Sequence, residues 1–137
     1  MVSALFDTSV LLDYLLGDKR AGAVFKQVSY RALSVITWVE VMSVAPAEKH
    51  ETTRGFLRSF ERLSISEAIA DEALRLIRDR PGLPFHRALT WATALVNQLI
   101  YITADARFVR DNDKGVLVPY ARSGSRPRAG RASASTQ

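Results

Sequence analysis

Short apolar segments alternate along this chain with stretches in which apolar residues recur at helical spacing. The short segments cover residues 2–6, 33–36, 63–65, 99–103 and 116–118. Brief apolar runs without polar alternation are typical of strands buried on both faces, and intervening helices connect such strands in parallel. The sequence therefore predicts an α/β fold with three layers, α/β/α, around a central parallel sheet of four to five strands.

The stretches between these segments predict helices, and two of them carry cap signals. Thr37-Trp38-Val39-Glu40 has the pattern of a capping box, and Ser66 precedes an apolar helical stripe. Pro119 closes the last segment and favours an edge position for that strand, because proline has no amide hydrogen to donate. The helices are expected at residues 10–15, 20–28, 37–45, 51–60, 66–77 and 85–98.

The positive charge of the chain is concentrated at its end. The net charge is +5, and residues 121–137 carry four arginines and no acid, so residues 1–120 carry only +1. The last segment consists mostly of Ser, Arg, Gly, Pro and Ala without an apolar pattern. We therefore predict one folded domain at residues 1–120 and a disordered basic tail at residues 121–137. The tail is interpreted either as an electrostatic arm for nucleic acid or as a solvated end without function.

Composition excludes several classes of protein. The chain contains no cysteine, which rules out disulfides and thiolate zinc sites. No apolar run approaches the roughly 18–20 residues of a membrane helix, and the first residues lack the basic segment and apolar core of a signal peptide. We expect a cytoplasmic protein that does not contact a membrane.

Three acidic residues follow predicted strands. Asp7 comes directly after the first strand, Glu40 lies one helical turn beyond the second, and Asp105 lies just past the strand that ends at Thr103. Carboxyl ends of parallel strands meet at one edge of a sheet, where ligands bind. Two carboxylates about 4 Å apart repel each other by roughly 4 kcal/mol at an effective dielectric near 20, so a cation must balance them. Oxygen ligands of this kind suit Mg²⁺ or Mn²⁺, although each acid alone could also serve as a cap or turn residue.

Five blocks of sequence occur in a characteristic order and at characteristic spacings: Phe6–Leu15, Ser34–Val41, Ala88–Ala94, Ile102–Asp105 and Gly115–Tyr120. In this order they resemble the PIN domain family, and within it the VapC-type ribonuclease toxins of type II toxin–antitoxin systems. The resemblance extends over residues 2–120. It implies a Mg²⁺- or Mn²⁺-dependent endoribonuclease that cleaves single-stranded RNA, forms a homodimer and is inhibited by a cognate antitoxin.

The resemblance also implies roles for individual residues. Asp7, Glu40 and Asp105 match three of the four acidic positions of the family, with Asp7 and Asp105 as the metal ligands and all three as catalytic residues. Ser9 matches a polar position that supports the first acid, and Thr103 matches one beside the last. In the enzyme that this implies, Glu40 would orient or deprotonate the attacking water.

The fourth acidic position of the family is occupied by Arg87. A cation in the first turn of a helix lies at the positive end of the helix dipole and needs an anionic partner. Two outcomes are open. Arg87 can point outward, which leaves one weakly held metal ion at Asp7 and Asp105 and slow cleavage. Alternatively, its guanidinium can take the place of the metal and pair with Asp7 or Glu40, so that the domain binds RNA or an antitoxin without cutting.

Several other residues have both a functional and a structural interpretation. A loop acid could replace the missing one, a histidine could bind metal or phosphate, and rim arginines could contact RNA, but solvation explains each of them as well. The two tryptophans are expected in core or dimer packing rather than in base stacking. A receiver-like signalling domain is disfavoured, because no aspartate follows the middle strand. The residues concerned are Asp79, Asp111, Asp113, His86, Arg107, Arg110, Trp38 and Trp91.

Overall fold

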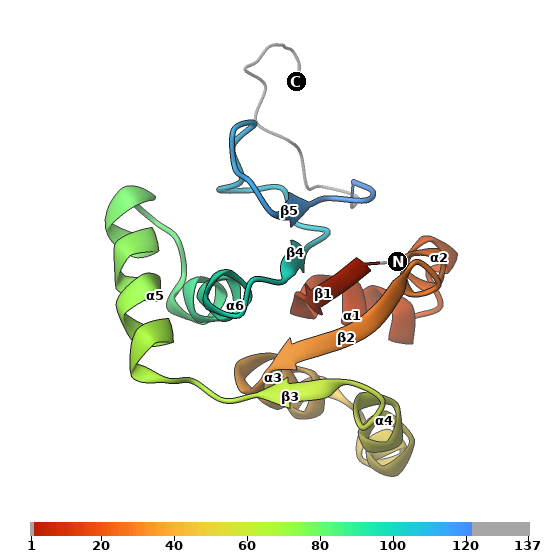
Figure 1. Cartoon of the computed structure of the whole chain (residues 1–137). Coiled ribbons are helices and arrows are strands. Elements are labelled where there is room, and N and C mark those ends of the chain that lie inside the picture. Colours follow the sequence, from red (N-terminus) through yellow and green to blue (C-terminus); the bar gives the residue numbers. More distant parts are fainter. Residues whose placement is uncertain (1, 122–137) are drawn as a thin grey trace.

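A computed structural model describes residues 2–121 of the chain, so the predicted basic tail lies, apart from Ala121, outside the described residues. In this part of the chain one sheet has five strands, all parallel, in the order β3-β2-β1-β4-β5 (Figure 1). The three-layer prediction is confirmed, with the larger of the two expected strand numbers. The strands are β1 (Val2–Phe6), β2 (Val28–Ser34), β3 (Glu61–Leu63), β4 (Ile100–Ile102) and β5 (Val116–Leu117).

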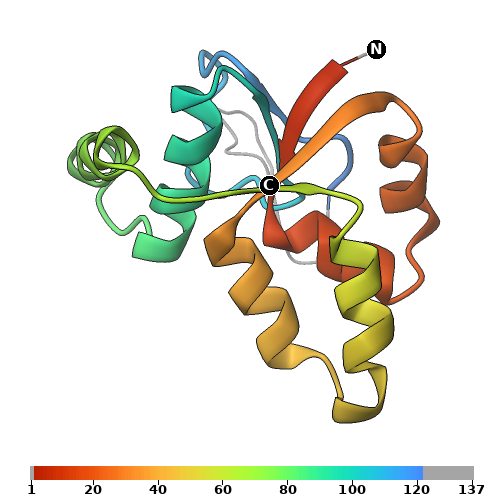
Figure 2. The same ribbon diagram turned by 60° about the horizontal axis from the view of Figure 1, so that its bottom comes forward.

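Helices cover both faces of this sheet (Figure 2). Residues of α1 to α4 form one apolar cluster and residues of α5 and α6 form the other. Strand β1 serves both clusters, since Ala4 and Phe6 belong to the first and Leu5 to the second, as the alternation of side chains along a strand requires. The helices are α1 (Thr8–Leu15), α2 (Lys19–Phe25), α3 (Val35–Val44), α4 (His50–Leu57), α5 (Glu67–Asp79) and α6 (Phe85–Val96), with a 3₁₀ turn, η1, at Ala47–Lys49.

The predicted capping box at residues 37–40 is wrong. Helix α3 begins at Val35, two residues earlier than expected, because the Ser34 hydroxyl accepts a hydrogen bond of 3.0 Å from the Ile36 amide and ends β2 there. Thr37 is fully buried, and its hydroxyl accepts from that of Thr8 at 3.1 Å. Glu40 is therefore free of the capping role, and its side chain serves the site described below.

The sheet brings the ends of its central strands together. Phe6 pairs with Ile102, and the Asp7 amide then donates to the Ile102 carbonyl at 2.8 Å, which extends the β1–β4 pairing by one residue. The chain enters α1 immediately after Asp7. Strand β5 lies at an edge, as Pro119 suggested. None of the helices within residues 2–121 is long and apolar enough to cross a membrane.

Candidate active site

Asp7 is held in one orientation by residues from two strand ends. Its Oδ2 atom accepts from the Ser9 hydroxyl at 2.7 Å, the Ser9 amide at 3.3 Å and the Thr103 hydroxyl at 2.9 Å. Its Oδ1 atom accepts from the Tyr101 hydroxyl at 2.9 Å. The Ser9 hydroxyl in turn accepts from the Ala104 amide, which ties the start of α1 to the end of β4. Asp7 is thus both the N-cap of α1 and a buried carboxylate at the carboxyl end of the central strands of the sheet.

Glu40 reaches the same region from α3. One of its carboxylate oxygens accepts from the Thr8 hydroxyl at 2.6 Å, and the other lies 2.8 Å from Nδ1 of His86. His86 stands in the first turn of α6, so this contact joins the two layers of helices at the edge of the sheet. The pair carries opposite charges only when His86 is protonated.

Asp105 follows β4, and its carboxylate accepts hydrogen bonds from Arg107. The Arg107 amide donates to Oδ1 at 3.0 Å, and its guanidinium Nη2 donates to Oδ2 at 2.6 Å. Burial alone would raise the pKa of the Asp105 carboxyl, but these hydrogen bonds and the nearby charge of Arg87 outweigh it and hold that pKa below its usual value. Asp105 therefore stays ionised and bears two guanidinium partners.

Arg87 points inward, which excludes the outward arrangement considered above. Its side chain is only 5% exposed. Nη2 donates to the Asp105 carbonyl at 2.5 Å, and Nη1 lies 3.4 Å from Oδ2 of Asp105, within ion-pair range although not aligned for a hydrogen bond. The expected partners, Asp7 and Glu40, are replaced by Asp105, because the first turn of α6 lies beside the end of β4.

Tyr101 completes the site and had not been identified from the sequence. It is fully buried on the α5/α6 side of β4, stacks on Trp91 with 5.4 Å between ring centroids, and donates to Asp7. Its hydroxyl also accepts from Nε of Arg87 at 3.4 Å, so it links the guanidinium to the first acid. Burial and the charge of Asp7 raise the pKa of Tyr101 well above its ordinary value. The sequence feature that could have indicated this role is a single tyrosine, Tyr101, within an otherwise aliphatic strand segment.

The three acids line one cavity of about 200 Å³. Burial works against the charge of Arg87, but Tyr101 and Asp7 outweigh it, and the pKa of the guanidinium is raised. With Arg87 and Arg107 both charged, the lining carries one net negative charge while His86 is neutral, because three carboxylates face two guanidinium groups. The lining residues are Asp7, Thr8, Ser9, Leu12, Glu40, Pro84, His86, Arg87, Asp105, Arg107 and Phe108.

The model of the PIN domain matches residues 4–113, which is most of the chain. The chain belongs to the PIN domain family. PIN domains are typically nucleases that use divalent metal ions. The resemblance inferred from the five sequence blocks is therefore confirmed.

Solved structures agree with this assignment. A toxin–antitoxin complex from Klebsiella pneumoniae contains a chain 33% identical to this PIN domain, with a TM-score of 0.81; the match covers 88% of this chain and 100% of that one. FitAcB from Neisseria gonorrhoeae is 20% identical with a TM-score of 0.69, covering 85% and 97%. DNA-bound VapBC from Salmonella typhimurium is 18% identical with a TM-score of 0.69, covering 85% and 96%, and these last two show the fold alone. No curated protein matches the chain.

The residues of this PIN domain do not fit a divalent metal ion as they stand. Both oxygens of Asp7 and of Glu40 already accept hydrogen bonds or face a histidine, and the Asp105 carboxylate is shared by two arginines. Within residues 2–121, no group of three or more His, Cys, Asp or Glu is arranged to hold a metal ion. At Asp105, one of the two metal ligands that the family resemblance implies, a divalent cation would meet the guanidinium groups of Arg87 and Arg107. Repulsion between these positive charges is unfavourable.

The loop acids do not replace the missing carboxylate. Asp113 accepts from Arg80 at 2.6 and 2.8 Å, and Asp79 pairs with Arg110 at 2.9 Å. Neither acid lines the cavity of the PIN domain, and Asp111 is also outside its lining. Arg110 pairs with Asp79 outside the cavity, so of the two arginines considered from the sequence it is Arg107 that lies at the rim of this site.

Proposed function

We propose that this protein is a toxin-type PIN module that binds RNA and a protein antitoxin, and that Arg87 keeps its hydrolytic centre inactive. One observation carries the proposal: a buried guanidinium lies against Asp105, where the family pattern has a fourth acid and a metal ion. The guanidinium supplies the positive charge that the converging carboxylates need, but it cannot activate a water molecule as a bound metal ion does. The acids are therefore stabilised without becoming reactive.

The rim of the cavity supports nucleic-acid binding. The side chain of Arg107 is 69% exposed and that of His86 is 57% exposed, and both border the cavity that contains Asp7. Arginine pairs with phosphate through two parallel hydrogen bonds, so Arg107 can exchange Asp105 for a phosphate of RNA. The toxin–antitoxin complex in which a similar chain occurs supports an antitoxin partner, and we propose the homodimer from the family resemblance alone.

The test exchanges the charge at position 87. Arg87→Asp restores the family's fourth acid, and we expect this variant to cleave single-stranded RNA with Mg²⁺ or Mn²⁺ and to stop when the metal is chelated. The unaltered protein should show no cleavage above background. In calorimetry, Mg²⁺ should release binding heat with the variant only.

Arg78→Asp is the matched control, because Arg78 is an exposed residue of α5 and the charge change is the same. The control should remain inactive. The proposal is wrong if the unaltered protein cleaves RNA as fast as Arg87→Asp. Cleavage by the unaltered protein that chelation does not remove would also contradict the metal-dependent alternative.

A second candidate function is a slow Mg²⁺-dependent endoribonuclease. It is favoured by the orientation of Asp7, whose four hydrogen bonds come from Ser9, Tyr101 and Thr103 and do not involve Arg87. This candidate requires Arg107 and Arg87 to leave Asp105. It predicts weak, chelation-sensitive cleavage by the unaltered protein that Arg87→Asp increases, whereas the first proposal predicts none before the substitution.

A further inference from the structure

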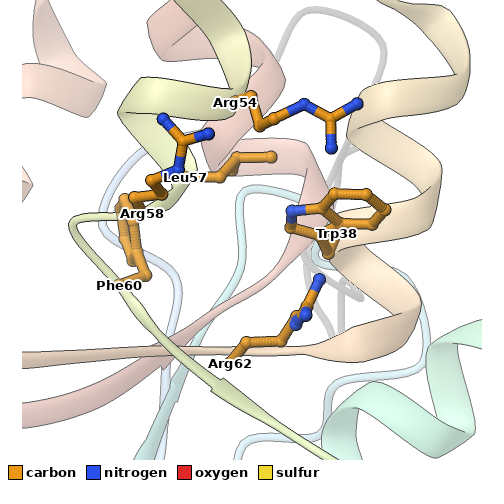
Figure 3. A pocket seen from close by; sticks show the side chains of 6 residues that line it. All are labelled: Trp38, Arg54, Leu57, Arg58, Phe60 and Arg62. Atoms are coloured by element: carbon orange, nitrogen blue, oxygen red, sulfur yellow. The ribbon is translucent and has the colours of Figure 1, made fainter. Parts of the chain in front are cut away.

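A second recess, of about 340 Å³, lies beside α3 (Figure 3) and is separate from the cavity lined by Asp7, Glu40 and Asp105, which we call the acidic cavity. Trp38 and Glu40 are two residues apart on α3 and therefore point to different sides of the helix. Glu40 faces the acidic cavity, and Trp38 faces α4 and β3. The recess is lined by Trp38, Arg54, Leu57, Arg58, Phe60 and Arg62, and we refer to it as the Trp38 recess.

Three guanidinium groups gather at the Trp38 recess, and none of the described residues that line it is acidic. Arg62 lies 4.9 Å and Arg54 5.6 Å from the centre of the Trp38 ring. In the view of Figure 3, Arg54 is above the indole and Arg62 is below it, while Arg58, at the end of α4, lies farther from the ring. The positive groups thus come from α4 and β3, and two of them flank one partly buried aromatic ring.

Apart from the contacts of Arg54 and Arg62 with Trp38, the fold uses these charges little. Arg54 is 3.7 Å from Glu51, whose side chain is 88% exposed, so this pair adds little stability. Arg58 and Arg62 form no ion pair with any residue of the described part. Arg54 and Arg58 are four residues apart, a spacing at which like charges repel each other, although the helix dipole favours cations at the C-terminal end of α4. Since residues 1–120 carry only +1 overall, the cluster is a local concentration of charge.

We propose that the Trp38 recess binds single-stranded RNA, with its arginines on the phosphates of a nucleotide outside the acidic cavity. This inference rests on the RNA partner of the proposed function and names a second contact for it. Guanidinium groups bind phosphate through paired hydrogen bonds, and basic grooves with aromatic side chains are typical of proteins that hold single strands. A strand held there would be anchored away from Asp105.

The size of the recess favours a nucleotide over the carboxylate of an acidic peptide. Its volume of about 340 Å³ falls in the range of ligand pockets, which begins near 300 Å³. A single carboxylate needs far less room and pairs with one guanidinium fork, which would leave two of the three arginines unpaired. A sugar, a base and its flanking phosphates can fill the space and engage Arg54, Arg58 and Arg62 together.

The experiment measures RNA affinity by fluorescence anisotropy, using a labelled single strand of about 12 nucleotides, within the site sizes of single-strand binders. The test variant combines Arg54→Gln, Arg58→Gln and Arg62→Gln. The control combines Arg75→Gln, Arg78→Gln and Lys114→Gln, which remove the same charge at exposed positions outside both cavities. We expect about tenfold weaker binding for the test variant only. Its salt dependence, d log K/d log[salt], should fall by about 2, because each single-strand phosphate contact contributes about 0.7.

Arg58→Gln alone guards against misfolding, since Arg58 is exposed and has no ion pair within residues 2–121. It should weaken RNA binding while leaving the thermal unfolding midpoint unchanged.

Equal RNA affinity of the unaltered protein and the triple variant would overturn the proposal that the Trp38 recess binds RNA, but it would leave the proposed function intact. Loss of binding to a glutamate-rich peptide, without loss of RNA binding, also overturns it and indicates a protein partner. If the unaltered protein binds no RNA, both the recess and the RNA partner fail, while the Arg87→Asp cleavage test is judged separately.

Discussion

Arg87 combines deep burial with a charge that it cannot lose, because the guanidinium stays protonated in proteins. Such a group is tolerated only where carboxylates and carbonyls surround it. Here the Asp105 carbonyl, the Asp105 carboxylate and the Tyr101 hydroxyl provide these partners. Without the cation, these three groups would face one another unpaired. Arg87 therefore stabilises the cavity of this PIN domain, and in the function that we propose it also keeps a metal ion out.

Tyr101→Phe tests the link between Arg87 and Asp7. Losing the hydroxyl should lower the free energy of unfolding at pH 7 by about 1–3 kcal/mol, because a buried carboxylate oxygen loses its donor. The pKa of Tyr101 is raised in the folded protein, whereas an unfolded tyrosine ionises near pH 10. The unaltered protein therefore keeps this stabilisation below about pH 10 and loses it as the pH rises further.

Urea denaturation at a series of pH values measures the effect. The difference in unfolding free energy between the unaltered protein and Tyr101→Phe should be constant up to about pH 10 and shrink above it. A difference that grows with alkaline pH would show that Tyr101 is not held neutral by Asp7.

At the scale of elements, the sequence predicted most of the sheet but not the details that orient the side chains. The apolar run Val2–Phe6 is a strand with the expected bounds, and α6 starts at Phe85 as predicted. The strand expected at residues 33–36 instead ends at Ser34, because the Ser34 hydroxyl caps α3 in place of the predicted Thr37. Tertiary contact decided between them, since Thr37 is buried against Thr8.

The direction in which the Arg87 side chain points could also not be predicted from the sequence. Its place in the first turn of α6 was predictable from the block pattern, but its partner depends on Tyr101 and Asp105. Which face of β4 carries Tyr101 is set by the register with β1, where Tyr101 pairs with Leu5. A shift of one residue would turn the phenol to the opposite face, and no local pattern in the sequence determines that register.

The segment after β4 depends on one buried ion pair, which Asp113→Ala removes. Burial would raise the pKa of Asp113, but Arg80 and the Arg110 amide outweigh it, so the pKa is lowered. Loss of the carboxylate leaves buried Arg80 with only the Phe108 carbonyl and a long contact to Asp79, and we expect the free energy of unfolding to fall by about 3 kcal/mol at pH 7. Because the folded pKa is lowered, this contribution is complete above about pH 4 and disappears at lower pH.

Asp111→Ala is the control for this prediction, since Asp111 is exposed and lies in the same loop. Thermal and urea unfolding at pH 7 and pH 3 should show a large, pH-dependent effect for Asp113→Ala and almost none for the control. Equal effects of the two substitutions would mean that the Arg80 pair does not hold the segment.

For the whole molecule, the proposed homodimer has a candidate surface on α5 and α6. Phe85 is 73% exposed and Leu74 is 46% exposed, and both border an apolar recess of about 250 Å³. Leu74→Glu should convert the dimer to a monomer in analytical ultracentrifugation, because a charge would be buried without a partner. Leu16→Glu, at an 84% exposed position after α1, should leave the dimer unchanged. A monomeric unaltered protein at micromolar concentration would rule out this assembly.

The loop from Asp105 to Asp113 is fastened to the α5/α6 layer at both of its ends. Arg87 binds the first residue, and Arg80, the C-cap of α5, binds the last residue and the Phe108 carbonyl. Opening this loop would leave the buried guanidinium groups of Arg87 and Arg80 without their partners. These contacts therefore hold the border of the acidic cavity in place before any ligand binds. If RNA binds there as we propose, it loses no affinity to the ordering of a loop, and we expect discrimination among strands to depend on their fit to a preformed rim.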